Sequence, residues 1–227
     1  MITTVIFDLD DTLYDEIDYC KSGFASVAGF LAGLPGAPAA ESILDALWKQ
    51  FSASNRTKTF NAALDELAID YDNTLIQRLV QIYRTHIPKI TLPSDSRNVL
   101  TRLSSKYTLA LLTDGFMPAQ KLKVRALGIE DYFKIIIYTE ELGREFWKPS
   151  PAGFEKIIKS LNAEPQALAY VADNQMKDFI APNNLGLATI RIIRPFSLHN
   201  AASPDPAAKA QHTIRQISEL PALLQKL

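Results

Sequence analysis

The sequence of 227 residues contains one cysteine, three histidines and almost no excess of charge. A single cysteine excludes an intrachain disulfide and a cysteine-rich metal site. The 24 basic and 25 acidic side chains leave a formal net charge of −1, so there is no broad cationic surface to attract nucleic acid or an anionic membrane. We therefore expect neither of them as a partner.

Long apolar runs are missing as well. No uninterrupted apolar segment reaches the roughly 20 residues that a membrane-spanning helix needs. The first residues also lack the charged region, apolar stretch and small-residue cleavage site of a secretory signal, so we expect a cytoplasmic protein. Apolar residues nevertheless make up 47% of the sequence, which is enough for a sizeable core.

Residues 15–92 have the pattern of a helical bundle. Apolar side chains recur at steps of three and four residues, as the buried face of a helix requires. In the first helix these residues are Ile17, Cys20, Phe24, Val27 and Leu31. Three more helices are indicated, around residues 43–51, 60–68 and 75–83. We expect Cys20 to be a small core residue.

Outside this segment, apolar strands alternate with helices. The strands are expected at residues 5–7, 107–112, 134–138, 167–172 and 187–193. Ser150 is expected to cap a helix that has Pro151 at its first position. The alternation predicts an α/β fold with a parallel sheet. Its core would consist of residues 1–14 and 93–227, with residues 15–92 inserted as an all-helical domain.

The first strand leads directly into two acids, Asp8 and Asp10. Its apolar run is typical of a central parallel strand, and ligands of such sheets bind beyond the carboxyl ends of the strands. Extended residues two apart point to the same side. The two carboxylates would therefore repel each other unless a cation, a shared proton or backbone donors relieved them. The pair by itself is also compatible with a polar turn.

Three further motifs follow the first in a fixed order. The four are Asp8-Leu9-Asp10-Asp11-Thr12, Leu111-Leu112-Thr113-Asp114-Gly115, Lys148-Pro149, and Val171-Ala172-Asp173-Asn174 with Asp178 five residues past Asp173. In these motifs the sequence resembles the haloacid dehalogenase-like hydrolases, from residue 3 to about residue 193. The resemblance implies a Rossmann-like core and a phosphatase with a helical cap inserted after the first motif.

The chemistry of three residues fits phosphoryl transfer. A carboxylate oxygen of Asp8, held in line with phosphorus, can displace an alcohol and form an aspartyl phosphate. Asp10 can protonate the departing oxygen and later deprotonate the attacking water. Lys148 can neutralise the phosphoryl group and keep Asp8 ionised.

The second motif is predicted to bind phosphate. The Thr113 hydroxyl and the backbone amides of Asp114 and Gly115 follow a strand end, where they can hold phosphoryl oxygens. Two departures from the family pattern occur, since asparagine often stands at position 114 and glycine at position 172. We expect the Asp114 side chain to point away from the substrate, and Ala172 to tighten the site slightly.

The cluster of acids requires a cation, and oxygen ligands without nearby histidine or cysteine favour Mg²⁺. The resemblance implies that Asp8, Asp173 and the main-chain carbonyl of Asp10 bind it. Asp178 has three open roles: it can ligate through water, orient the lysine of the third motif, or cap the following helix. Asn174 is expected to form a hydrogen bond behind the ligands.

The motifs also bear on other functions. Dehalogenases of this family lack the second carboxyl, because a halide needs no proton, so Asp10 argues against that activity. Sugar phosphomutases keep all four motifs and stay an alternative. A receiver-like phosphoacceptor module has a different motif order, and a non-catalytic binding protein usually lacks a motif residue. We predict a magnesium-dependent phosphatase of a small phosphorylated metabolite, chosen by contacts from the cap.

Overall fold

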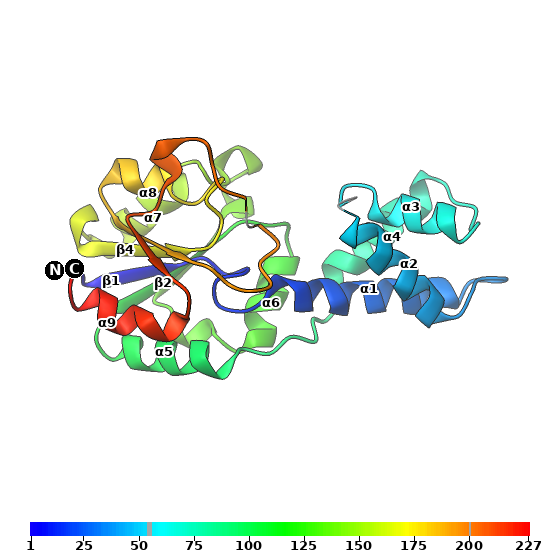
Figure 1. Ribbon diagram of the computed structural model, residues 1–227, viewed down its shortest axis with the longest axis horizontal. Helices are drawn as coiled ribbons and strands as arrows, with labels where there is room; N and C mark the ends of the chain where they lie inside the picture. The colour runs from blue at the N-terminus through cyan, green and yellow to red at the C-terminus, as the bar shows by residue number, and fades with distance from the viewer. Residues whose placement is uncertain (54–55, 200) are drawn as a thin grey trace. The chain divides into compact units, whose positions relative to one another are not determined.

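The computed structural model describes residues 1–53, 56–199 and 201–227. It divides into two compact units (Figure 1). The first consists of Met1–Ile17 and Thr91–Leu227, and the second of Asp18–Ile90. The second unit is therefore an insertion in the chain of the first. The two units are described separately below.

The first unit contains a six-stranded sheet in the order β3-β2-β1-β4-β5-β6. The strands are β1 (Thr4–Phe7), β2 (Thr108–Thr113), β3 (Ile135–Tyr138), β4 (Leu168–Ala172), β5 (Ala188–Ile192) and β6 (His212–Ile214). Every neighbouring pair is parallel. The predicted parallel α/β fold is confirmed. All four residues of β1 are buried, as expected for a central strand.

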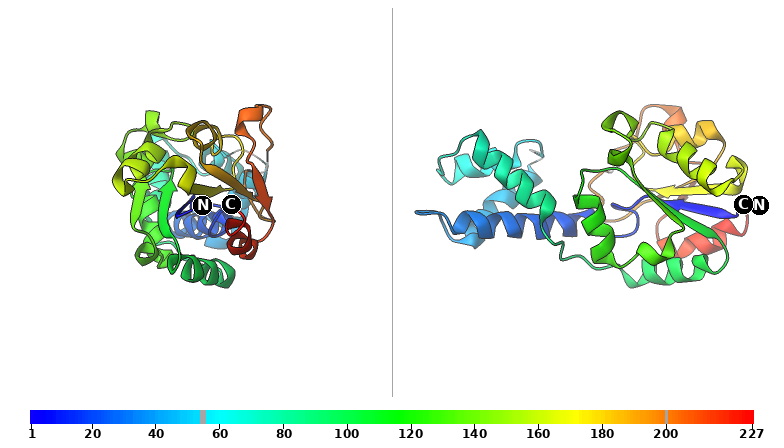
Figure 2. Two further views of the ribbon diagram at one scale, coloured as in Figure 1. Left: turned by 90° about the vertical axis from the view of Figure 1, so that its left-hand side faces the viewer. Right: turned by 180° about the vertical axis from the view of Figure 1, so that it is seen from behind.

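Helices cover both faces of this sheet. They are α5 (Ser94–Ser104), α6 (Ala119–Leu127), α7 (Ala152–Leu161), α8 (Ile180–Leu185) and α9 (Leu220–Leu224). In Figures 1 and 2, α5 and α9 lie on one face and α7 and α8 on the other. Both chain termini lie at the end where β1 begins. The opposite edge, where the strands end, carries the residues of the four motifs.

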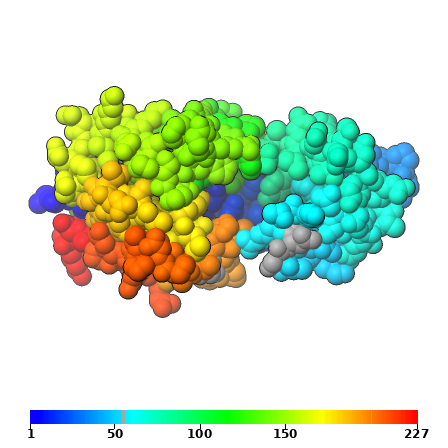
Figure 3. All heavy atoms as spheres, turned by 90° about the horizontal axis from the view of Figure 1, so that it is seen from above, coloured from blue at the N-terminus to red at the C-terminus, as the bar shows by residue number. Residues whose placement is uncertain are grey.

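Short 3₁₀ segments complete the first unit. They are η1 (Glu130–Tyr132), η2 (Thr139–Glu141), η3 (Arg144–Phe146), η4 (Pro165–Ala167), η5 (Pro206–Ala208) and η6 (Ile217–Glu219). In Figure 3 the orange segment around η5 lies beside α8. The Asn183 side chain on α8 fixes it by donating to the carbonyls of Ala207 and Lys209, both at 2.9 Å.

The predicted start of α7 is wrong by one residue. The helix begins at Ala152, and Pro151 stands just before the first helical position. Ser150 does not cap the helix in the usual way, because its hydroxyl only accepts a long hydrogen bond of 3.4 Å from the Ala152 amide. Pro151 occupies the N-cap position, so Ser150 lies one residue too early in the sequence to cap the helix.

The second unit contains four helices joined by loops, and its described residues include no strand. Its helices are α1 (Glu16–Ala32), which starts within the first unit, α2 (Ala40–Ser52), α3 (Thr59–Glu66) and α4 (Asn73–Thr85). Their common core is aromatic, since the ring of Phe24 contacts those of Trp48, Phe51, Phe60 and Tyr83. Cys20 is buried here as expected, with its Sγ 3.3 Å from the Tyr83 hydroxyl.

None of the helices in the described parts of the chain combines the length and the apolar character needed to cross a bilayer.

Candidate active site

The motif residues meet because three neighbouring strands end at one edge of the sheet. Phe7 at the end of β1 is in register with Leu111 of β2 and Val171 of β4. Asp8 follows β1, Thr113 closes β2, and Asp173 follows β4. Parallel strands in register bring their next residues together, so side chains more than 100 residues apart in sequence share one site.

Lys148 lies between two buried carboxylates. Its Nζ is 2.6 Å from Asp8 Oδ1 and 2.8 Å from Asp178 Oδ1. The Tyr170 hydroxyl accepts from Lys148 at 3.0 Å and donates to Asp178 Oδ1 at 3.1 Å. Although burial by itself would lower the pKa of Lys148, Asp178 and Asp8 raise it well above its ordinary value. Of the three roles left open for Asp178, this geometry favours orienting Lys148.

Asp8, Asp173 and Asp178 form a buried group of acids that fits a divalent cation. Each offers an oxygen, and these oxygens lie within 4.8 Å of one another. Burial, reinforced by the charges of Asp178 and Asp8, raises the pKa of Asp173 to about 9. Burial also raises the pKa of Asp8 to about 6, although Lys148 opposes it. A cation held by oxygen ligands would relieve this crowding of negative charge.

Two of these three acids are better placed than the third to bind a metal. Both oxygens of Asp178 are engaged, because Oδ2 accepts from the Asn174 amide at 3.0 Å while Oδ1 accepts from Lys148 and Tyr170. Asp8 and Asp173 are thus the carboxylates best suited as ligands. The Asn174 side chain accepts from the Met176 amide at 2.9 Å, so it shapes the loop after β4.

The loop that carries Asp173 is also fixed from β5 and from the segment after it. The Ser197 hydroxyl donates to Asp173 Oδ2 at 2.9 Å. Arg191 in β5 donates through Nε to the Asp173 carbonyl at 3.0 Å and through a terminal nitrogen to Gln175 Oε1 at 2.7 Å. These contacts hold Asp173 and the loop that follows β4 in place.

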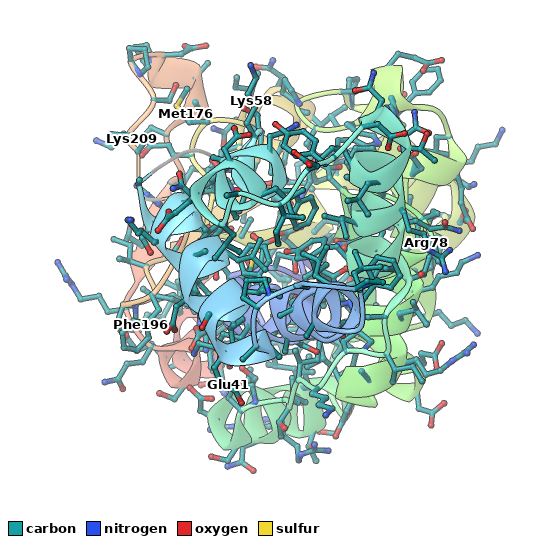
Figure 4. All side chains as sticks on the ribbon, turned by 90° about the vertical axis from the view of Figure 1, so that its right-hand side faces the viewer. Glu41, Lys58, Arg78, Met176, Phe196 and Lys209 are labelled. Atoms are coloured by element: carbon teal, nitrogen blue, oxygen red, sulfur yellow. The ribbon has the colours of Figure 1, made fainter. Side chains whose placement is uncertain are left out.

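Two exposed apolar side chains flank these loops. Met176, next to Lys177, is 50% exposed, and Phe196, next to Ser197, is 68% exposed. Both are labelled in Figure 4.

Asp10 is held by three donors. Lys123 lies 2.8 Å from Oδ1 and 2.9 Å from Oδ2. Gln120 donates to Oδ2 at 2.9 Å, and the Tyr14 hydroxyl donates to Oδ1. Burial alone would raise the pKa of Asp10, but the charge of Lys123 and these hydrogen bonds bring it below its ordinary value. In this arrangement Asp10 is a carboxylate, the form that accepts a proton.

Thr113 is connected to Asp10 through Gln120. The Gln120 amide donates to Thr113 Oγ1 at 2.6 Å as well as to Asp10. Gly115 has a φ of +146°, and a Cβ atom there would lie 2.7 Å from Gln120 Cδ. Glycine at this position therefore makes room for Gln120.

The Asp114 side chain is buried and compensated by a lysine. Its carboxylate accepts from Thr139 Oγ1 at 2.8 Å, from the Lys148 amide at 3.3 Å and from Lys177 Nζ at 3.1 Å. Burial would raise the pKa of Asp114, but the charges of Lys148 and Lys177 lower it overall. Lys177 is the most exposed of the site's lysines, with 32% of its side chain accessible.

Sequence reasoning missed several residues that surround the motifs: Gln120, Lys123, Tyr170, Lys177 and Ser197. For the first two a signal was available, because they share the buried face of α6 with Val124 and Leu127. A polar side chain on a buried helix face requires a partner. The other three carry no pattern that distinguishes them from ordinary surface or strand residues.

Comparisons with known proteins identify the family to which this chain is similar. A family model described as haloacid dehalogenase-like hydrolase matches residues 5–192. The glyceraldehyde 3-phosphate phosphatase of Methanopyrus kandleri is 29% identical over 86% of this chain and 85% of its own length. The N-acylneuraminate-9-phosphatase of Rattus norvegicus is 28% identical over 100% of this chain and 95% of its own length.

Solved structures share the fold. A 2-haloacid dehalogenase from Pseudomonas syringae superposes with a TM-score of 0.67 at 23% identity, covering 100% of this chain and 99% of that chain. YfnB from Bacillus subtilis, whose structure is bound to magnesium, gives a TM-score of 0.69 at 21% identity and covers 98% of both chains. At these identities the similarity establishes the architecture alone.

Proposed function

The chain belongs to the haloacid dehalogenase-like hydrolases, and we propose that it is a magnesium-dependent phosphatase of a small phosphorylated metabolite. The observation that carries this proposal is the buried contact of Lys148 with Asp8, beside Asp173. A second acid, Asp10, follows two residues after Asp8. The relatives named as phosphatases, which match over most of their length, support the same reaction. Asp10 provides the proton donor that an alcohol leaving group requires.

The reaction would proceed in two steps through an aspartyl phosphate. First, an Asp8 oxygen attacks phosphorus, the bond from phosphorus to the leaving oxygen breaks, and Asp10 gives its proton to that oxygen. Then a water molecule attacks phosphorus, Asp10 takes a proton from it, and the bond to Asp8 breaks. Inorganic phosphate leaves, and both acids return to their initial states.

The first step needs Asp10 in its protonated form. A phosphate dianion that binds beside Asp8 brings negative charge toward Asp10, which raises the pKa of Asp10 and favours proton uptake. After the leaving group has taken that proton, the charge of Lys123 supports the carboxylate that acts as base toward water. The same side chain would thus serve both steps.

Phosphate would be held by groups from the other motifs. Lys148 contributes a buried positive charge, and the Thr113 hydroxyl with the amides of Asp114 and Gly115 contributes hydrogen bonds. Magnesium, held by Asp8, Asp173 and the main-chain carbonyl of Asp10, would supply further positive charge against the phosphoryl oxygens. We propose that residues 15–92 serve as the cap that selects the leaving group.

The proposal is tested by a phosphate-release screen over sugar phosphates, nucleotides and short-chain phosphoacids in the presence of Mg²⁺. We expect turnover of at least one small phosphomonoester, loss of turnover in excess EDTA, and recovery when Mg²⁺ is restored. Asp8→Asn should remove activity while preserving the shape of the side chain. Undiminished release in EDTA would refute the metal requirement, and wild-type activity in Asp8→Asn would refute the nucleophile.

A further inference from the structure

Helix α6 presents two buried polar side chains to the site. Gln120 is 1% exposed and Lys123 is 4% exposed. Residues three apart on a helix lie on one face, and the rest of this face is formed by buried Ala119, Val124 and Leu127. Burying an amide and an ammonium group costs free energy unless both find partners. Both find them at Asp10.

The contacts restrict the Asp10 carboxylate in more than one direction. Lys123 Nζ bridges both of its oxygens, at 2.8 and 2.9 Å. Gln120 holds Oδ2 at 2.9 Å and, through the same nitrogen, Thr113 Oγ1 at 2.6 Å. The Tyr14 hydroxyl donates a further hydrogen bond to Oδ1. With both oxygens bound, rotation of the carboxyl group or movement of the whole side chain breaks at least two hydrogen bonds.

Stability alone is a weak explanation for this arrangement. Desolvation of a buried ion pair largely cancels its attraction, so well-packed apolar side chains at positions 120 and 123 would serve the fold as well or better. Lys123 also lies 3.7 Å from Glu16, whose pKa burial and the charge of Asp10 raise to about 7. The Lys123 ammonium group thus lies near two acids, but it is closer to Asp10 than to Glu16.

We propose that Lys123 and Gln120 are positioning residues that hold the Asp10 carboxyl in line for proton transfer at the group bonded to Asp8. Lys123 fixes the orientation of the Asp10 carboxyl plane. Gln120 fixes the distance between the Asp10 carboxyl group and Thr113, which is proposed to bind phosphate. This inference rests on the proposed phosphatase function. Both residues bind the Asp10 carboxyl group, and both act through it.

The test is Lys123→Met with 4-nitrophenyl phosphate, whose leaving group needs no proton. Asp8 should still be phosphorylated, but water should be activated poorly, so we expect turnover to fall about 100-fold. The phosphoryl adduct on Asp8, measured by intact mass after acid quench, should rise to most of the enzyme. Lys123→Arg should restore most of the turnover. Lys121→Met, on the exposed side of the same helix, should match the wild type.

A merely structural role predicts a different result. Loss of packing would slow phosphorylation and hydrolysis together, so turnover would fall without accumulation of the adduct. That outcome, or wild-type turnover in Lys123→Met, would overturn the proposal. Gln120→Met provides a second variant, for which we expect a smaller loss of about tenfold with the same adduct.

A crystallographic comparison separates this inference from the proposed function. In the structures of Lys123→Met and Gln120→Met, the Asp10 side chain should leave its wild-type orientation while the strands keep theirs. An unmoved Asp10 in both variants would refute the positioning role even if the protein hydrolyses phosphate. If neither the wild type nor any variant releases phosphate, the phosphatase function fails, whereas the orientation of Asp10 still decides whether the pair positions it.

Discussion

Gly115 and Gln120 lie so close together that a side chain at position 115 would collide with Gln120 in its present position. A Cβ atom there would be 2.7 Å from Cδ and 2.9 Å from Oε1 of Gln120, well inside normal contact distance. The φ of +146° is also one that residues with a side chain rarely adopt. The absence of a side chain at position 115 thus allows the Gln120 amide to lie where it contacts both Thr113 and Asp10.

Gly115→Ala should therefore destabilise the protein by about 1–3 kcal/mol, from backbone strain and overpacking. It should also lower phosphate release, because Gln120 must move. Urea denaturation measures the first effect. Adding Gln120→Ala should recover part of the stability and none of the activity. Gly29→Ala, where a Cβ meets nothing within 4 Å, is the control and should be neutral or slightly stabilising. Equal stability of Gly115→Ala and wild type would contradict the packing argument.

Asp10→Asn should separate the two chemical steps. The amide keeps the shape of the side chain but can neither donate the acid's proton nor accept one from water. An aryl phosphate should still phosphorylate Asp8, and the adduct should accumulate because its hydrolysis lacks a base. Intact mass after rapid acid quench measures it, with Asp8→Asn as the blank. An adduct that maps to another residue would disprove the assignment of Asp8.

The metal-free protein should lose stability as the pH rises. The pKa of Asp173 is raised from 3.8 to about 9, and that of Asp8 from 3.8 to about 6. Between pH 4 and 9 the folded state thus binds more protons than the unfolded state, so the free energy of unfolding falls as the pH increases. Melting temperatures in EDTA at pH 5, 7 and 9 should decline.

Two controls accompany that measurement. Asp173→Asn should flatten the decline, because the neutral amide carries no charge to lose or gain. Saturating Mg²⁺ should flatten it as well, since the cation stabilises the ionised carboxylates. A decline of the same slope in the wild type and in Asp173→Asn would show that other groups are responsible.

Asp114→Asn should strengthen phosphate binding. The asparagine oxygen can still accept from Thr139 and from the Lys148 amide, but the negative charge that pairs with Lys177 is lost. Lys177 is then available to an anion, so the inhibition constant of inorganic phosphate should fall roughly threefold to tenfold, less at high salt. Lys177→Met should raise it by a similar factor. Identical constants in all three proteins would mean that Lys177 does not reach the phosphate.

The sequence was sufficient for most of the architecture because each relevant pattern is local, although β6 (His212–Ile214) was not among the five expected strands. The apolar runs predicted the five strands β1 to β5, and β1 is buried throughout because its residues Thr4–Phe7 have a helix-covered face on each side. The spacing of apolar residues at three- and four-residue steps in residues 17–83 is also a local pattern, and it predicted four helices. The start of α7 was wrong by one residue, since a choice between Ser150 and Pro151 at a helix end depends on small differences in backbone angles.

The motif residues could be selected in advance because they follow strands, and parallel strands end at a common edge. That rule alone was sufficient to select Asp8, Thr113 and Asp173 as site residues. Their roles stay predictions, to be decided by the experiments above. Asp178 had three possible roles on sequence alone, and its contacts with Lys148 and Tyr170 favour the orientation of Lys148, which stays a prediction.

Tertiary structure alone decided the surroundings of the motifs. Gln120 and Lys123 reach Asp10 across 110 and 113 residues of sequence, and Lys177 reaches Asp114 across 63. Local propensity determines whether a residue lies in a helix or a strand. The partner of a buried charge depends instead on which elements pack together and at what distance. The position and pKa of a buried carboxylate depend on its distances to those partners. Only the tertiary structure therefore determines them.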